Sequence, residues 1–137
     1  MRTSYVDTDV IIRLLTGDDP QKQKTATALF EKVARDELVL LAPVTVIADS
    51  VYVLASAHLY HVPRVTIRDL LASLLRYSSF KVESKQTVLA ALDIYADLNI
   101  DFSDALLVVV TAQSHDKLIY SYDHDFDKIP GITRKEP

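Results

Sequence analysis

Four aspartates occupy positions in this sequence that suggest chemistry. Asp7 and Asp123 each follow a short apolar stretch, where a strand is expected to end. Asp49 lies in a stretch that is apolar almost all round a helix and is therefore expected to be buried, and Asp104 stands at the start of another very apolar helix. Carboxylates ligate hard ions such as Mg²⁺ and Mn²⁺, and two such ions held about 3.5–4 Å apart can cleave a phosphodiester bond.

Each aspartate also has an ordinary structural explanation. Asp7 and Asp123 are in positions where turn residues are common. Asp104 could be a first-turn acid, which stabilises any helix by about 0.3–1 kcal/mol. Asp49 could lie on a polar, solvent-facing stripe of its helix. An isolated buried carboxylate is costly, however, and the joint placement of all four favours a shared metal site over four unrelated acids.

Helices and short strands are expected to alternate along the chain. This alternation predicts a parallel sheet covered by helices on both faces. Ligands of such sheets bind beyond the carboxyl ends of the strands, where Asp7 and Asp123 would lie. Strands are expected at 4–6, 38–41, 80–82, 118–121 and 131–134, and helices at 9–16, 20–36, 43–60, 63–77, 88–98 and 102–115, with a buried strand at 108–110 as the alternative for the last helix.

The composition is typical of one globular domain, which we expect to span residues 1–137. The chain has 137 residues, of which 49% are hydrophobic, and only two glycines. It has no cysteine, which excludes disulfides and thiolate zinc sites. We expect no signal peptide and no membrane segment, and hence a cytoplasmic protein, because every apolar run is short or interrupted by charge.

The net charge of −4 does not decide whether the chain binds nucleic acid. Phosphate contacts require Lys and Arg, so an acidic balance argues against RNA at first sight. Each divalent ion held by a carboxylate cluster adds two positive charges and reverses the local sign. Whether the chain can bind nucleic acid therefore depends on where its carboxylates lie.

Four segments around the aspartates resemble the motifs of PIN domains, and of the VapC-type toxins in that family. The segments are YVDTDVIIRLL at 5–15, PVTVIADSVYVL at 43–54, DFSDALL at 101–107 and SYDHDFDKIPG at 121–131, and Asp-Asp-Pro follows the first one. The resemblance spans essentially the whole chain. It implies a three-layer α/β/α fold with a central parallel sheet, and an endoribonuclease that uses Mg²⁺ or Mn²⁺. It also implies a homodimer that is inhibited by a cognate antitoxin protein.

The resemblance implies a role for individual residues as well. The expected catalytic and metal-binding residues are Asp7, Asp49, Asp104 and Asp123. By position, Thr8 and Ser121 could orient these carboxylates as hydrogen-bond donors. Asp127 is a weaker candidate for the same supporting role.

Two positions depart from the family pattern. Asp9 stands where the family usually has Asn, and its extra negative charge could strengthen metal binding or only add repulsion. Asp49 stands where the family usually has Glu. Because Asp is one methylene shorter, Asp49 could reach a metal only through water.

Two other interpretations stay open. The segment at 6–10 also fits the DxDx[TV] pattern of haloacid-dehalogenase-like phosphohydrolases, in which Asp7 would be a nucleophile, but no convincing Ser/Thr and Lys partners are found. The second interpretation is a PIN-like module that has lost catalysis and only binds a partner. The Asp at position 49, where the family usually has Glu, favours it.

The remaining polar residues near the motifs are expected to lie at the surface. Asp125 is expected to face solvent, and Arg13 is more simply a surface residue than a phosphate contact. His58 and His61 lack a third ligand for a transition metal.

Overall fold

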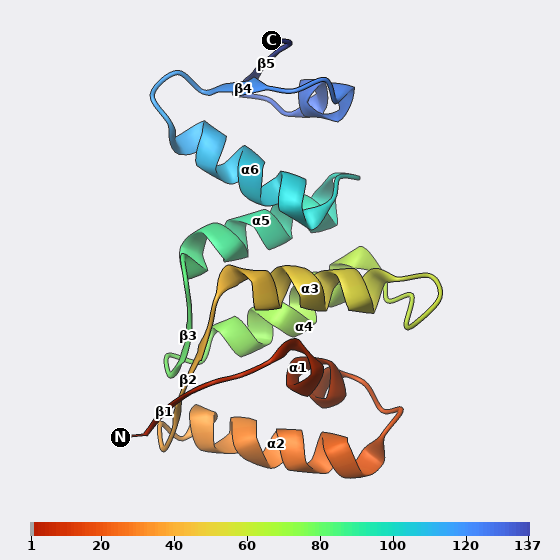
Figure 1. Cartoon of the computed structure of the whole chain (residues 1–137), viewed down its shortest axis with the longest axis vertical. Helices are drawn as coiled ribbons and strands as arrows, with labels where there is room; N and C mark the ends of the chain where they lie inside the picture. Colours follow the sequence, from red (N-terminus) through yellow and green to blue (C-terminus); the bar gives the residue numbers. More distant parts are fainter. Residues whose placement is uncertain (1) are drawn as a thin grey trace. The chain divides into compact units, whose positions relative to one another are not determined.

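The computed structural model describes residues 2–137, which group into two compact units (Figure 1). We call residues 2–85 unit 1 and residues 86–137 unit 2 and describe each by itself. In the part of the chain that is described, no helix has the length and apolar character needed to cross a membrane.

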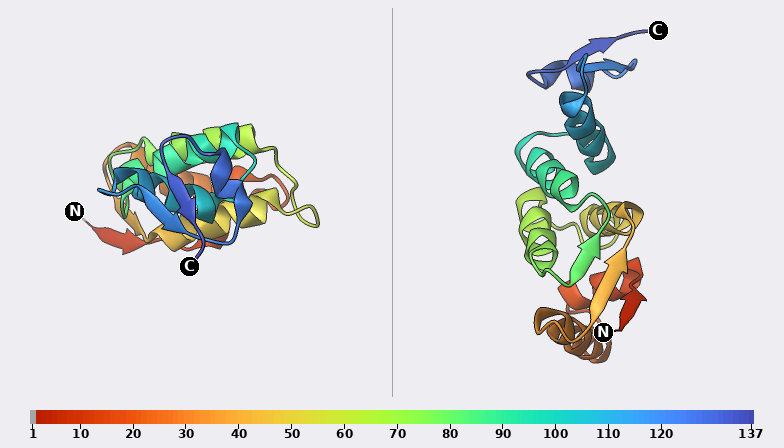
Figure 2. Two further views of the ribbon diagram at one scale, coloured as in Figure 1. Left: turned by 90° about the horizontal axis from the view of Figure 1, so that it is seen from above. Right: turned by 90° about the vertical axis from the view of Figure 1, so that its left-hand side faces the viewer.

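Unit 1 contains a three-stranded parallel sheet and four helices. The strands lie side by side in the order β1-β2-β3 and point the same way (Figure 2). Thr3 pairs with Val39, and Leu40 pairs with Phe80. In chain order the elements are β1 (Thr3–Tyr5), α1 (Thr8–Leu15), α2 (Pro20–Ala34), β2 (Val39–Ala42), α3 (Val44–Ala55), α4 (Arg64–Leu75) and β3 (Phe80–Val82).

The helices of unit 1 start where the sequence provides caps. Asp19 accepts a hydrogen bond from the Lys22 N–H at 3.1 Å, and Pro20 occupies the first position of α2, where its missing N–H costs nothing. Helix α1 packs against both α2 and α3, and α3 packs against α4. Their buried faces meet the sheet in a core where the rings of Phe30 and Phe80 pack edge to face, with centroids 5.5 Å apart.

Unit 2 contains two helices, a two-stranded parallel sheet and a short 3-10 helix. Strand β4 pairs with β5 in the register of Leu118 with Thr133. The ring of Tyr95 packs edge to face on that of Phe102, with centroids 6.3 Å apart. In chain order the elements are α5 (Lys85–Asp97), α6 (Phe102–Gln113), β4 (Leu118–Tyr120), η1 (His124–Lys128) and β5 (Thr133–Lys135).

The alternation of helices and strands predicted from the sequence is confirmed. The mixed α/β architecture with parallel strands is present, and the strand at Phe80–Val82 has the expected limits. Residues 108–110 are helical, so the strand alternative there is wrong. The helix expected at 43–60 ends at Ala55, because the chain turns back and the Val62 N–H bonds to the Leu54 carbonyl oxygen at 2.8 Å.

Among residues 2–137, four residues other than glycine adopt the left-handed backbone conformation. Asp36, His61, Ser84 and Lys117 have φ values of 60°, 48°, 54° and 52°. Each lies between helices and strands rather than inside one. The left-handed region is strained for residues with a Cβ atom, so these four turns are maintained by their surroundings.

Candidate metal site

Asp7 is placed by the junction of β1 and α1. The Val6 N–H bonds to the Leu41 carbonyl oxygen at 3.1 Å and extends the β1–β2 ladder to the residue before Asp7. Asp7 then caps α1, and its Oδ1 accepts a hydrogen bond from the Thr8 N–H at 2.7 Å. The carboxylate is exposed at the N-terminal end of α1.

Asp49 is exposed on α3, so the expectation that it is buried is wrong. The buried face of α3 carries Ile47, Val51 and Leu54, whereas Asp49 lies on the opposite face near Tyr52, which is 77% exposed. The apolar character of Tyr52 made this face resemble a buried one in the sequence.

Asp104 lies in the first turn of α6 and is partly buried. Burial raises the pKa of its carboxyl above the ordinary value. Negative charge on three other aspartates raises this pKa further, in the order Asp101, Asp123 and Asp125. Negative charge in unit 2 therefore acts on Asp104, and a bound cation would relieve this repulsion.

Asp123 begins the 3-10 helix η1. Its Oδ1 accepts a hydrogen bond from the Asp125 N–H at 2.9 Å, and its own N–H donates to Ser121 Oγ at 2.9 Å. Ser121 therefore contacts Asp123 through the backbone, where its hydroxyl accepts rather than donates. Thr8 likewise contacts Asp7 through its backbone N–H. Both residues fix the capping turns that carry the carboxylates.

Arg134 in β5 organises the segment around Asp123, and sequence analysis missed it. Its side chain is only 10% exposed. Nη1 donates to the Ser121 carbonyl oxygen at 2.9 Å, and Nε donates to Asp127 Oδ1 at 2.9 Å. Nη2 lies 3.0 Å from Nδ1 of His124, the residue after Asp123. A basic residue in a short terminal strand carries no sequence signal for this role.

Asp127 belongs to this network. Its hydrogen bond with Arg134 lowers the pKa of its carboxyl, and a contact with His124 Nδ1 at 3.1 Å lowers it further. Asp127 therefore supports the geometry of the 121–136 segment. Asp125 is not fully solvent-facing as expected, because it is partly buried and pairs with Lys128 at 3.2 Å.

The other polar residues considered in the sequence lie at the surface. Arg13 pairs with Asp18 at 3.0 Å. His58 and His61 are exposed, and His61 lies beyond the end of α3. Among residues 2–137, no three His, Asp or Glu side chains come together in a group that could hold a metal.

The four predicted ligands are divided equally between the units. Asp7 and Asp49 belong to unit 1, and Asp104 and Asp123 belong to unit 2, so a single cluster of all four stays a prediction. Their chemistry fits a hard divalent ion, because all four offer carboxylate oxygen and none offers sulfur or imidazole. The mutual repulsion of acids in unit 2 is a second observation that fits a cation.

Comparison with known proteins identifies the family. The PIN domain family model matches residues 4–132, which is nearly the whole chain and includes all four aspartates. A comparison with curated proteins finds no significant match. The mixed α/β architecture with parallel strands agrees with a PIN-like α/β/α fold. The order of the elements agrees with the family match, and this chain belongs to the PIN domain family.

Proposed function

We propose that this protein is a metal-dependent endoribonuclease of the VapC type, the toxin of a toxin–antitoxin pair. PIN domains are generally metal-dependent nucleases. The observation that supports the proposal is the partly buried Asp104 of unit 2, whose carboxyl pKa is raised by burial and by the negative charge of neighbouring aspartates, as is common at functional sites.

Asp7, Asp49, Asp104 and Asp123 are the proposed ligands of Mg²⁺ or Mn²⁺. Such ions, when bound, generate the hydroxide and stabilise the leaving oxygen of an in-line displacement at phosphorus. The protein's part is to hold the carboxylates rigidly. Asp7 and Asp123 are fixed by the backbone N–H groups that they cap, and Arg134 fixes the segment of Asp123.

A catalytically inactive binding module is the second candidate. One observation favours it, namely that Asp49 is shorter than the family's usual Glu and is exposed rather than held in place by neighbours. A haloacid-dehalogenase-like activity has lost its support, because the PIN domain family model matches residues 4–132, which include the motif at Asp7.

The proposed partners follow from the VapC assignment. We propose a cytoplasmic homodimer that cuts RNA and is held inactive by a cognate antitoxin. Light scattering of the purified chain tests the dimer. Co-purification with the product of the neighbouring reading frame tests the antitoxin, and a monomer that captures no such product contradicts the toxin assignment.

RNA cleavage by the wild type and by Asp7→Asn tests the proposed activity. We expect cleavage in Mn²⁺, none in EDTA and none by Asp7→Asn, whose fold stays intact because the substitution removes a charge and almost no volume. Asp69→Asn is the matched control, since Asp69 is an exposed acid on α4 outside the motifs. Full cleavage in EDTA contradicts the metal mechanism. Metal binding without cleavage of any RNA favours the inactive module.

A further inference from the structure

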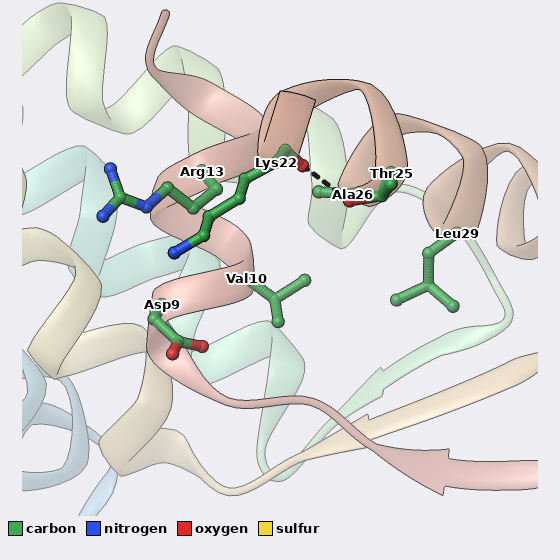
Figure 3. A pocket seen from close by; sticks show the side chains of 7 residues that line it. All are labelled: Asp9, Val10, Arg13, Lys22, Thr25, Ala26 and Leu29. Carbon is green, nitrogen blue, oxygen red and sulfur yellow. Dashed lines mark hydrogen bonds between the residues drawn. The ribbon is translucent and has the colours of Figure 1, made fainter. Parts of the chain in front are cut away.

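Helices α1 and α2 enclose a groove of about 410 Å³ that lies entirely within unit 1 (Figure 3). Its volume lies within the usual range of about 300–1,000 Å³ for small-molecule sites. The function proposed above does not use this groove. Its lining residues are Asp9, Val10, Arg13, Lys22, Thr25, Ala26 and Leu29.

Two cations lie at the groove and keep donors available. The Lys22 ammonium makes no hydrogen bond or ion pair with any residue of the described chain, and Figure 3 shows it extended toward α1. Arg13 gives one N–H to Asp18 at 3.0 Å, and a guanidinium has five such donors. An anion of the size of a phosphate would therefore meet a lysine and an arginine at this position.

The opposite charge in the groove is the carboxylate of Asp9. It is exposed in the first turn of α1, where it accepts no hydrogen bond from any residue in 2–137. A carboxylate repels phosphate but accepts hydrogen bonds from hydroxyl groups, including those of ribose. The groove thus has a site for an anion and a site for a hydroxyl, with Val10, Ala26 and Leu29 providing apolar surface.

The groove is also close in sequence to the proposed reaction centre. Asp7 caps the same helix whose residues Asp9 and Arg13 line the groove. Arg13 lies six positions after Asp7, which corresponds to about 9 Å along a helix axis at 1.5 Å per residue. A strand of RNA cut at Asp7 could therefore place a neighbouring nucleotide in the groove.

We propose that the α1–α2 groove is a ribonucleotide subsite, in which Arg13 and Lys22 bind an RNA phosphate and Asp9 accepts the 2′-hydroxyl. The proposal rests on the RNA-cleaving function, and it adds the part of the substrate that this chain recognises. Because the 2′-hydroxyl distinguishes RNA from DNA, Asp9 is the residue that makes the groove selective for RNA.

Fluorescence anisotropy with a short single-stranded RNA and its DNA counterpart tests the subsite. Binding is measured in EDTA, and again in Mg²⁺ on an Asp7→Asn background, so that the RNA stays intact. Lys22→Ala is compared with Lys24→Ala, which removes the same charge from the same helix at an exposed position outside the groove. Alanine favours helix at both positions, so the fold is retained.

We expect Lys22→Ala to weaken RNA binding severalfold and to reduce the slope of log K against log salt by about 0.7, the value for one lost phosphate contact on a single strand. Lys24→Ala leaves the RNA affinity and the salt slope unchanged. Asp9→Asn narrows the preference for RNA over DNA. In cleavage assays, Lys22→Ala raises KM with little change in kcat.

If Lys22→Ala and Lys24→Ala weaken RNA binding equally while metal-dependent cleavage is intact, the proposed subsite is wrong and the proposed nuclease activity is still supported. Selective weakening by Lys22→Ala in a protein that never cleaves RNA supports the subsite and contradicts the nuclease. If polyglutamate displaces bound RNA as effectively as unlabelled RNA does, the groove is a general anion site and the ribonucleotide assignment is wrong. A wild type that binds no RNA in either condition also overturns the assignment.

Discussion

The two halves of the proposed metal site are held in different ways. In unit 1, Asp7 and Asp49 are both exposed, and Asp7 is fixed by a single backbone N–H. In unit 2, Asp104 is partly buried with its pKa raised, and Asp123 lies on a segment that Arg134 ties together with several hydrogen bonds. Unit 2 therefore holds its carboxylates against their own repulsion, whereas unit 1 presents its acids to solvent at little cost.

This difference indicates where a metal ion would bind first. A cation gains most where it removes existing repulsion and where the ligands need no reorganisation. The first condition is met at Asp104, whose pKa neighbouring acids raise, and the hydrogen bonds of Arg134 favour the second around Asp123. Four substitutions test this contrast.

The largest expected effect is that of Asp104→Asn on cleavage. Loss of this carboxylate should reduce the cleavage rate by more than about 100-fold, the upper range for residues that only support a metal ligand. Asp49→Asn should have a smaller effect, because the short Asp49 side chain would reach a metal only through water. Cleavage rates at saturating Mn²⁺ compare the two variants. A larger loss in Asp49→Asn reverses the proposed contrast.

The next effect is that of Arg134→Ala on metal affinity. Without Arg134 the segment that carries Asp123 loses its hydrogen bonds to the Ser121 carbonyl and to Asp127, and we expect Mn²⁺ to bind about 10–100-fold more weakly. Arg134→Lys should restore part of the affinity. Arg35→Ala is the control, since Arg35 also pairs with a nearby carboxylate, that of Glu37, but in unit 1. Calorimetric titration with Mn²⁺ measures all three variants, and equal losses in Arg134→Ala and Arg35→Ala would show that Arg134 has no special part.

A smaller effect concerns pH and stability without metal. The raised pKa of Asp104 means that the folded state binds this proton more tightly than the unfolded chain, in which Asp titrates near pH ~3.9. The contribution of Asp104 to the free energy of unfolding is fully present below the pKa of the unfolded chain. It is lost as pH rises through the pKa that Asp104 has in the folded state.

At neutral pH, Asp104→Asn should therefore melt higher than the wild type in EDTA, and the gap should close as pH falls. The gap is expected to be a few degrees at most, since 1 kcal/mol corresponds to about 2–8 °C for a domain of this size. Asp49→Asn should show no such gap, because Asp49 is exposed. Thermal melts over a pH series measure both, and a constant gap at every pH would contradict the role of repulsion.

The smallest effect is that of Asp49→Glu. The added methylene lets the carboxylate reach farther from α3, and we expect a modest increase in cleavage rate at low Mn²⁺ with unchanged melting temperature, since the side chain is exposed. Rates across a Mn²⁺ series provide the measurement. A decrease would show that the site is built around the shorter aspartate.

Much of the fold could be predicted from the sequence because its local signals agree. Pro20 after Asp19 begins α2 as expected, and the apolar stretch Phe80–Val82 is a strand with the predicted limits. The early end of α3 could not be predicted, because residues 57–60 suit a helix. The Tyr60 hydroxyl instead donates to Asp18 Oδ2 at 2.5 Å, across 42 residues of sequence.

The candidate site was predictable in its acids but not in their surroundings. The motifs around Asp7 and Asp104 mark them by position and lie within the family match, whereas the role of these residues as metal ligands stays a prediction. The exposure of Asp49 was missed because Tyr52 counts as apolar in a helical pattern while it lies in solvent. The role of Arg134 was missed because its partners come from other segments, which a local pattern does not reveal.

The four left-handed turns have a practical consequence for such experiments. Lys117 adopts φ 52° and its side chain is exposed, so Gly at this position would remove the Cβ strain and no packing. The strain of about 1–2 kcal/mol exceeds the backbone entropy that Gly costs, about 0.5–1 kcal/mol. Ser84 presents the same opportunity in an exposed turn. A chain with only two glycines thus retains room for engineered stability at its turns, and a background stabilised there would tolerate the destabilising substitutions needed to map the acids one at a time.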